Sequence, residues 1–175
     1  MIDLTLKKYS QGALEALKEN VKCYPEDGEL WWSSYSDSRR FDKPIGSVGG
    51  DGYPEFNFTY EGKNYRYKVH IVLWALTYGE WPSSQLDHKD RVRHNNKIDN
   101  LRGCSYSENL ANRSSRGLSK YRGVCYYKAT GDWTARVMKE GVSYYLGYFK
   151  TEEDAHQAYK TKAKELYGEF YTDGE

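Results

Sequence analysis

Residues 86–109 read LDHKDRVRHNNKIDNLRGCSYSEN, and this stretch is the most informative part of the chain. It holds two His, four Asn and three Asp. A solvated loop would account for so many polar side chains, and a metal site would account for them equally well. Asp87 and Asn109 bracket the stretch, and each offers a hard oxygen of the kind that Mg²⁺ prefers. The composition therefore leaves a surface loop and an oxygen-rich metal site both open.

The order of elements expected in this stretch would bring its two ends together. A strand end at Leu86 is followed by a long polar loop, a second strand around Leu101 and a helix. Ser105 and Glu108 have the spacing of a capping box at the start of that helix. His88 has a side chain whose pKa suits taking a proton from water near neutral pH. Asn100 would either hold the loop or orient the imidazole by a hydrogen bond.

A zinc site is the alternative reading of the same polar residues. His88, His94 and Cys104 are the available ligands, but a fourth ligand at the usual spacing is lacking. The three Cys of the chain are widely spaced and form no CxxC pair, so neither a disulfide framework nor a Cys-rich zinc site is indicated. A reducing cytosol fits this cysteine usage.

Composition and charge narrow the class of protein. A chain of 175 residues suits one ordinary domain or two small ones. No window approaches eighteen consecutive apolar residues, and the N-terminus lacks an apolar signal segment, so we expect a soluble cytoplasmic protein that is not exported. Residues 84–139 carry 12 Lys and Arg against 5 Asp and Glu, between more acidic ends. A basic middle of this kind indicates a polyanion-binding surface or a solvated face.

The pattern before the polar stretch predicts a mixed α+β region rich in strands. A short amphipathic helix is expected from about Gln11, and a strand is expected after the turn at Gly28. Residues 44–70 alternate aromatic and polar positions between Asp-Gly and Glu-Gly turns, which predicts a meander of antiparallel strands. Residues 70–79, HIVLWALTYG, predict a buried helix that ends at Gly79.

The pattern after the polar stretch predicts a second, smaller domain. Residues 115–120, SRGLSK, read as a small, polar and basic linker. Three antiparallel strands follow, YRGVCYYK, WTARVMK and SYYLGYF, separated by short turns. Residues 151–168 predict a helix with Thr151 and Asp154 as its capping box. The expected organisation is residues 1–114, a linker at 115–120, and a βββα domain at 121–175.

The polar stretch resembles the HNH nuclease motif of phage homing-type endonucleases. The segments DH, NN, DNLR and SxxN occur in order at the spacing of that family, and DGELWW, GYPEFNF and VHIVLWALTYGEWP resemble the segments that precede its motif. The resemblance covers about residues 10–115. It implies a ββα-metal motif at about 84–114 and hydrolysis of phosphodiester bonds with a divalent metal, Mg²⁺ or another such as Mn²⁺.

The resemblance also implies roles for individual residues. His88 corresponds to the general base, Asp87 and Asn109 to the two metal ligands, and Asn100 to the middle Asn of the motif, which we count with the catalytic residues. His70 corresponds to the His of the family's VHR segment, which would help to position either the phosphate or the fold. The Arg that normally follows it is Ile71 here. His94 is interpreted as a variable loop residue.

The C-terminal unit resembles the Apetala-type (ethylene-response-factor) DNA-binding domain. YRGV, WxAxV, LGxFxTxExA and AY recur, and the resemblance implies a three-stranded sheet that enters the major groove. Cys125, Tyr127 and Met138 stand where plant members carry Arg, and Tyr145 stands for Trp, so the plant target sequence does not transfer. Trp133 is expected in the core. The candidate DNA contacts over the whole chain are Arg122, Tyr127, Lys128, Arg136, Lys139, Arg113 and His70.

Three functions remain in competition at this stage. The first is a site-specific, metal-dependent DNA endonuclease of phage homing type. It would act as a monomer on double-stranded DNA in the cytoplasm of the bacterial host, with neither a membrane nor a small molecule as partner. The second is a sequence-specific DNA-binding protein with an inactive nuclease-like domain, although the intact set of Asp87, His88, Asn100 and Asn109 speaks against it. The third is a structural or RNA-binding protein, which no motif supports.

Overall fold

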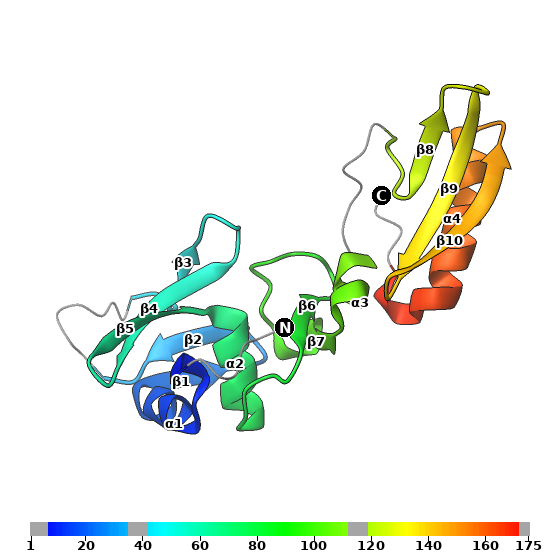
Figure 1. Cartoon of the computed structure of the whole chain (residues 1–175). Helices are drawn as coiled ribbons and strands as arrows, with labels where there is room; N and C mark the ends of the chain where they lie inside the picture. Colours follow the sequence, from blue (N-terminus) through cyan, green and yellow to red (C-terminus); the bar gives the residue numbers. More distant parts are fainter. Residues whose placement is uncertain (1–6, 35–41, 112–118, 172–175) are drawn as a thin grey trace. The chain divides into compact units, whose positions relative to one another are not determined.

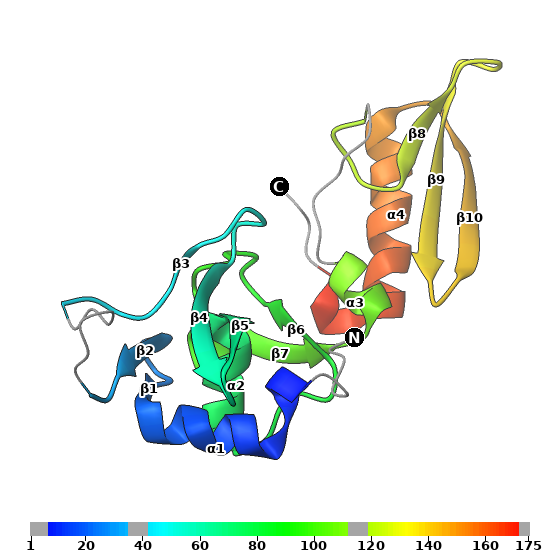
Figure 2. The same ribbon diagram turned by 60° about the vertical axis from the view of Figure 1, so that its left-hand side comes forward.

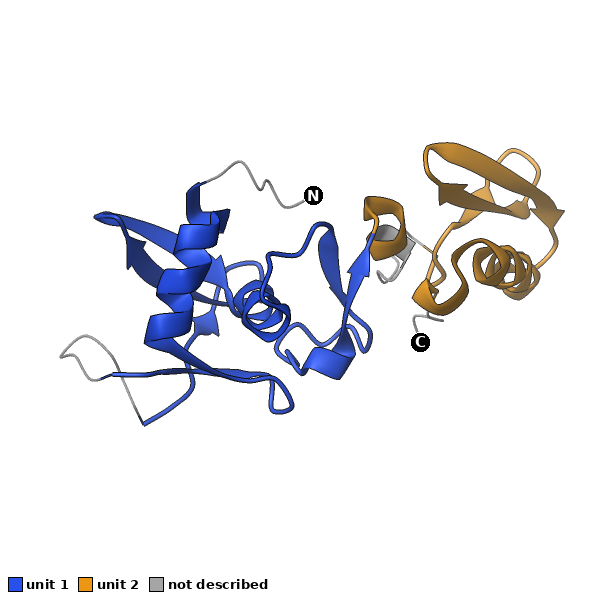
Figure 3. Cartoon of the chain, turned by 90° about the horizontal axis from the view of Figure 1, so that it is seen from below, with its two compact units in different colours: residues 1–104 blue, residues 105–175 orange. Residues whose placement is uncertain are grey.

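A computed structural model describes residues 7–34, 42–111 and 119–171 of the chain. The chain divides into two compact units, residues 1–104 and 105–175 (Figure 3). This division assigns the helix that follows the polar stretch to the second unit, whereas the sequence analysis kept it with the first domain. Most of the expected linker at 115–120 lies outside the described residues, so that linker stays a prediction. The molecule is a mixture of helices and strands, as the sequence predicts.

The first unit begins with a helix packed beside a hairpin (Figure 1). A 3-10 turn, η1 (Lys7–Tyr9), leads into α1 (Gln11–Asn20), whose N-cap Ser10 accepts a hydrogen bond from the Ala13 amide at 3.2 Å. The helix buries Ala13, Leu14 and Leu17, so the amphipathic helix expected from Gln11 is confirmed. Strands β1 (Val21–Tyr24) and β2 (Glu29–Trp32) then pair antiparallel.

A three-stranded sheet and a buried helix complete the core of this unit. Strands β3 (Ser47–Val48), β4 (Pro54–Tyr60) and β5 (Lys63–Lys68) form an antiparallel sheet in that order, as the meander pattern predicts. Helix α2 (Val69–Tyr78) follows directly and ends at Gly79, which adopts φ 81° as expected of a left-handed C-cap. Tyr67 and the apolar residues of α1, α2 and β4 share one hydrophobic core.

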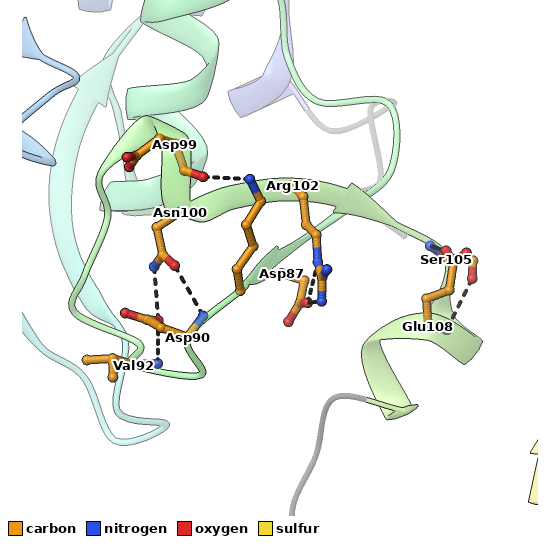
Figure 4. A network of polar contacts seen from close by, with 9 residues as sticks. Asp87, Asp90, Val92, Asp99, Asn100, Arg102, Ser105 and Glu108 are labelled. Carbon is orange, nitrogen blue, oxygen red and sulfur yellow. Dashed lines mark hydrogen bonds and ion pairs between the residues drawn. The ribbon is translucent and has the colours of Figure 1, made fainter. Parts of the chain in front are cut away.

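The polar stretch forms a hairpin with a long connection. Strand β6 (Gln85–His88) pairs antiparallel with β7 (Leu101–Cys104), and a 3-10 turn, η2 (Ile98–Asn100), closes the loop between them. Helix α3 (Tyr106–Ala111) follows β7 directly. Its capping box is present: the Glu108 amide donates to Ser105 Oγ at 3.2 Å and the Ser105 amide donates to Glu108 Oε2 at 2.8 Å (Figure 4). The expected order of strand, loop, strand and helix is confirmed.

The second unit consists mainly of one sheet and one long helix. Strands β8 (Val124–Tyr127), β9 (Asp132–Lys139) and β10 (Val142–Phe149) form an antiparallel sheet with β9 in the centre. Helix α4 (Glu152–Tyr167) covers one face of this sheet, and a 3-10 turn, η3 (Gly168–Phe170), follows it (Figure 2). Three Ala on the inner side of α4 and at the centre of β9 permit close packing; the buried residues are Val124, Ala135, Val137, Ala155, Tyr159, Ala163 and Tyr167.

Among the described residues, no helix is long and apolar enough to cross a membrane.

Candidate active site

Asp87 and His88 lie side by side at the carboxyl end of β6. They are consecutive residues of a strand, so their side chains point to opposite faces of the hairpin. Both are buried, with exposed fractions of 7% for Asp87 and 3% for His88. Pairing of Asp87 with Arg102 and of His88 with Leu101 fixes both backbone positions. Burial of two adjacent ionisable side chains is costly unless each has a partner, and the hairpin supplies one for each.

Arg102 is the partner of Asp87. From the opposite position on β7 it donates two hydrogen bonds to Asp87 Oδ2, from Nε at 3.0 Å and from Nη2 at 2.9 Å (Figure 4). Both side chains of this ion pair are largely buried. This contact was not predicted from the sequence, which indicated the two strands but not their register.

Asn96 is the partner of His88. Its Oδ1 lies 3.1 Å from His88 Nε2, and its side chain is buried in the loop between the two strands. A carboxamide oxygen can only accept, so with Oδ1 in this position Nε2 carries the proton and Nδ1 carries the lone pair of the neutral ring. From the sequence, contact with the imidazole was one of two roles left open for Asn100, and Asn96 was not considered; the amide that contacts His88 is that of Asn96.

Asn100 instead holds the loop together. Its Oδ1 accepts from the Asp90 amide at 3.1 Å, and its Nδ2 donates to Asp90 Oδ1 at 3.0 Å (Figure 4). The same Nδ2 donates to the Asn95 carbonyl at 2.7 Å. Burial acts to raise the pKa of Asp90, but hydrogen bonds from Asn95, Val92 and Asn100 outweigh it and leave the pKa below its usual range. Of the two roles open for Asn100, these contacts support the loop-holding one.

His70 lies against the ring of His88. The two ring centroids are 5.1 Å apart with the rings nearly perpendicular, and the Tyr53 ring contacts both, at 5.1 Å from His70 and 5.7 Å from His88. The His70 side chain is only 5% exposed, and its Nδ1 has no hydrogen-bond partner within the described part of the chain. Burial lowers the pKa of His70 to about 3, so the ring is neutral at pH 7. This setting supports a packing role beside His88 over direct contact with DNA.

The imidazole of His88 is also held in its neutral form. Burial is the largest influence and lowers the pKa of His88, while the hydrogen bond with Asn96 and the charges of Asp90 and Asp87 act against it without reversing the shift. A neutral imidazole can accept a proton, whereas an imidazolium cannot. His88 therefore has the protonation state that a general base requires at neutral pH.

A loop distant in sequence covers this pair of His. The Asp51 carbonyl accepts a hydrogen bond from Arg93 Nη1 at 2.7 Å, and the Arg93 guanidinium lies 5.2 Å from the Tyr53 ring. Lys68 Nζ lies 4.3 Å from the same ring and pairs with the Asp51 carboxylate. These contacts tie the loop before β4 to the loop between β6 and β7. The sequence analysis did not find Tyr53 or Arg93, since their contact depends on tertiary structure.

The turn between β1 and β2 supports the loop that carries Asn96. The Ile98 amide donates to the Pro25 carbonyl at 2.9 Å. Gly28 adopts φ 74°, and a Cβ placed there would lie 2.5 Å from the Lys97 amide nitrogen and 2.7 Å from the Asn96 carbonyl carbon. Both neighbours are backbone atoms, which cannot rotate away. Only glycine fits at this contact.

We expect Gly28→Ala to destabilise the protein by roughly 1–3 kcal/mol and to slow any cleavage that depends on His88, because the added methyl group pushes the backbone of Asn96. The measurement is denaturant unfolding together with the rate of DNA cleavage under conditions in which the variant is folded.

The matched control for this prediction is Gly62→Ala. Gly62 also has a positive φ, 71°, but a Cβ there would meet nothing within 4 Å. It therefore shares the backbone strain of the Gly28 variant without the collision, and its cleavage rate should stay unchanged. Equal losses of cleavage in both variants would argue against support of Asn96 by the turn.

The described residues contain no cluster of three His, Cys, Asp or Glu side chains suited to a metal ion. The zinc alternative is therefore wrong for His88, His94 and Cys104, all three of which are described. His88 and Cys104 lie at opposite ends of the hairpin, since His88 pairs with Leu101 and Cys104 with Gln85. Asn109, the second predicted metal ligand, lies on α3 and is partly exposed. Arg113 lies outside the described residues.

The predicted DNA contacts of the second unit lie in different surroundings. Tyr127 and Arg136 are exposed on the side of the sheet opposite α4, and Lys128 is exposed in the turn after β8. Lys139 lies on the α4 side, where its Nζ donates to the Leu166 carbonyl at 2.5 Å. Arg122 is partly buried; burial raises the pKa of the Tyr159 hydroxyl, and the charge of Arg122 acts against that shift. Trp133 packs against the core, as predicted.

The family model of the HNH endonucleases matches residues 67–111. This segment contains the whole β6–β7 hairpin, including Asp87 and His88. This segment of the chain is therefore similar to the HNH endonucleases.

Individual relatives are similar to this chain over stretches of different length. The uncharacterized HNH endonuclease L560 of Acanthamoeba polyphaga mimivirus is 33% identical over 126 residues, which cover 70% of this chain and 63% of that protein. The ethylene-responsive transcription factor WRI1 of Arabidopsis thaliana is 46% identical over 56 residues, 31% of this chain and 13% of that protein. The chain thus spans less than two thirds of the length of these relatives.

Among solved structures, the chain is similar to that of I-HmuI, an HNH homing endonuclease that binds and cleaves DNA. The TM-score is 0.41 and the identity 25%, over 53% of this chain and 51% of that chain.

Proposed function

We propose that the protein is a metal-dependent, site-specific DNA endonuclease of the homing type. The observation that carries the proposal is the buried, neutral His88, which Asn96 holds and which directly follows Asp87 in β6, within the segment that matches the HNH endonucleases. A buried imidazole with one nitrogen fixed by an amide oxygen is a prepared proton acceptor. Its function would be to take a proton from the water that attacks a phosphodiester bond.

Several residues keep His88 ready for this step. Asn96 Oδ1 holds Nε2 of His88, so the lone pair on Nδ1 of His88 points away from Asn96. His70 and Tyr53 pack against the ring and exclude water from its faces. Asn100 fixes the loop from which Asn96 projects. The base therefore needs little reorganisation when the substrate arrives, which lowers the barrier to proton transfer.

The residue types present fit a hard divalent cation such as Mg²⁺ or Mn²⁺. Asp87 offers a buried carboxylate, whose position Arg102 fixes, and Asn109 would add an amide oxygen. One carboxylate with an amide leaves several ligand positions for water and phosphate, which is the way in which Mg²⁺ is usually bound. When bound, such an ion would stabilise the negative charge that develops on the phosphate and on the leaving oxygen.

The second unit would supply recognition of double-stranded DNA. Its support is the similarity to a transcription factor over 56 residues, together with exposed Tyr127, Lys128 and Arg136 around one side of the sheet. We propose that the protein binds as a monomer and acts in the cytoplasm of a bacterial cell that a phage infects. The alternative function is a sequence-specific DNA-binding protein whose nuclease-like unit is inactive.

Incubation of the purified chain with mixed phage and bacterial DNA tests the proposal. With Mg²⁺ or Mn²⁺ we expect discrete fragments, and with EDTA we expect none. Denaturing gels of end-labelled fragments would map the cut on each strand and show whether one strand or both are cleaved.

Two results would speak against the endonuclease. Cleavage that continues at full rate in EDTA would exclude a metal-dependent mechanism. Specific DNA binding without cleavage under any divalent metal would favour the inactive, DNA-binding alternative.

A further inference from the structure

One side of the sheet in the second unit is exposed and rich in aromatic and sulfur-containing side chains. Strand β9 alternates, so that Ala135 and Val137 face α4 while Arg136 and Met138 face the other way. Cross-strand pairing adds Cys125 opposite Thr134, and Tyr145 opposite Arg136. We call this side the reading face; its residues are Cys125, Tyr127, Thr134, Arg136, Met138, Tyr145 and Tyr148.

A bulge in β10 enlarges this face. The register shifts between Tyr145 and Gly147, so that Tyr148 comes opposite Thr134. Without the shift, residues three apart in a strand would point to opposite sides. Gly147 adopts φ 111°, which side chains rarely allow. As a result the Tyr145 and Tyr148 rings are 5.9 Å apart, and the Tyr127 and Tyr148 rings are 5.7 Å apart.

The exposed apolar area on this face is large for so small a unit. Met138 is 50% exposed, and Tyr127, Tyr145 and Tyr148 are 46%, 51% and 57% exposed. A pocket of about 490 Å³ on this face is bordered by Cys125, Tyr127, Met138 and Tyr145. Contiguous exposed apolar surface of this kind marks a contact surface for a ligand or a partner.

The charges around the reading face favour a polyanion. Arg136 lies in the central strand, and Lys128 follows β8. Asp132, at the edge of the face, is paired with Lys150 at 2.7 Å. The acidic first turn of α4, with Glu152, Glu153 and Asp154, belongs to the helix that covers the other side of the sheet. A nucleic acid is therefore the occupant that both the charge and the apolar surface fit.

We propose that the reading face recognises thymine-rich duplex DNA by packing against thymine methyl groups, with Arg136 as its single reader of guanine. In the major groove only thymine presents a methyl group, which apolar side chains contact, whereas Arg pairs with guanine. Met138, Cys125 and the Tyr edges supply apolar contacts, and the face carries one Arg. This inference rests on the proposed function, because it names the DNA that the second unit would read.

Unpaired bases are the competing occupant, since aromatic rings on a sheet can stack on single strands. The Tyr145 and Tyr148 rings meet at 75° and the Tyr127 and Tyr148 rings at 51°. Each ring thus turns toward a neighbouring ring instead of standing alone as a flat platform. This arrangement favours edge contacts with a duplex groove.

The test replaces thymine with deoxyuracil, which removes the methyl group and leaves the base pairing unchanged. The full-length chain, kept in EDTA to prevent cleavage, is first used to select its preferred duplex from a random pool. Its affinity is then measured for that duplex with each thymine replaced in turn. We expect a loss of about fourfold for each contacted methyl group, the value for burial of one such group. The dependence of affinity on salt should not change, since no phosphate contact is lost.

A pair of variants locates the contact on the sheet. Met138→Ala should lose the preference for thymine over deoxyuracil at the position that Met138 contacts, and should keep it at the other sensitive positions. Val142→Ala is the matched control: Val142 is 53% exposed on β10, but it pairs with Lys139, which faces α4. This variant should keep the full preference for thymine.

Three other outcomes would each contradict a different part of the proposal. A selected duplex that shows no loss with deoxyuracil at any position overturns the thymine inference and leaves the endonuclease proposal standing. Tighter binding to one strand than to the duplex assigns the reading face to unpaired bases instead. Failure to select any duplex, with no cleavage of DNA in Mg²⁺, removes the proposed function itself.

Discussion

Replacing His88 with Ala is expected to lower the rate of DNA cleavage by about 10²–10⁴-fold, the usual contribution of a general base. Affinity for DNA should stay close to that of the wild type, because His88 is only 3% exposed and the candidate DNA contacts of the second unit are untouched. The measurements are single-turnover cleavage with Mg²⁺ and a gel-shift titration in EDTA.

Loss of a buried side chain also affects stability, so the prediction needs two controls. His88→Asn keeps a polar side chain beside Asn96 and should preserve more of the fold, yet it lacks a group that can take a proton near neutral pH. His94→Ala changes an exposed His in the same loop and should cleave at the wild-type rate. Full activity in His88→Ala, or equal losses at His88 and His94, would contradict the assignment of His88 as the base.

The local elements of the first unit could be predicted because their signals are local. The apolar run of α2 and its Gly79 cap lie within about ten residues, where periodicity and capping chemistry act, and the same holds for the Ser105–Glu108 capping box at the start of the second unit. The motif spacing likewise singled out Asp87 and His88, which the structure places together at the end of β6.

The tertiary partners of the site could not be predicted in the same way. Asn95, Asn96 and Asn100 are the same residue type within six positions, and only the folded loop shows that Asn96 contacts His88 while Asn100 binds Asp90. Gly28 contacts the loop from a turn almost seventy residues earlier. In the second unit, the alternation of side chains along β9 puts Lys139 on the side of the sheet that faces α4 and Arg136 on the opposite side. The charge pattern of the sequence does not distinguish these two residues.

The ion pair between Asp87 and Arg102 allows a structural role of Asp87 to be separated from a chemical one. Asp87→Leu and Arg102→Leu should each destabilise the protein by about 3–5 kcal/mol, because each leaves one buried charge without its partner. The double variant removes both charges and should recover most of that loss, since apolar replacement of a buried ion pair is often neutral. Denaturant unfolding of the three variants measures this.

The cleavage rates of the three variants should rank differently from their free energies of unfolding. If Asp87 is a metal ligand, the double variant will be folded but will remain inactive at any concentration of Mg²⁺. Arg102→Leu keeps the Asp87 carboxylate and should therefore retain some activity when it is assayed below its unfolding temperature. Lys150→Met is the matched control for loss of a salt bridge, since Lys150 is 88% exposed and its pair with Asp132 should contribute little to stability. Wild-type cleavage by the double variant would show that Asp87 serves the fold alone, because a stable protein without that carboxylate would still perform the reaction.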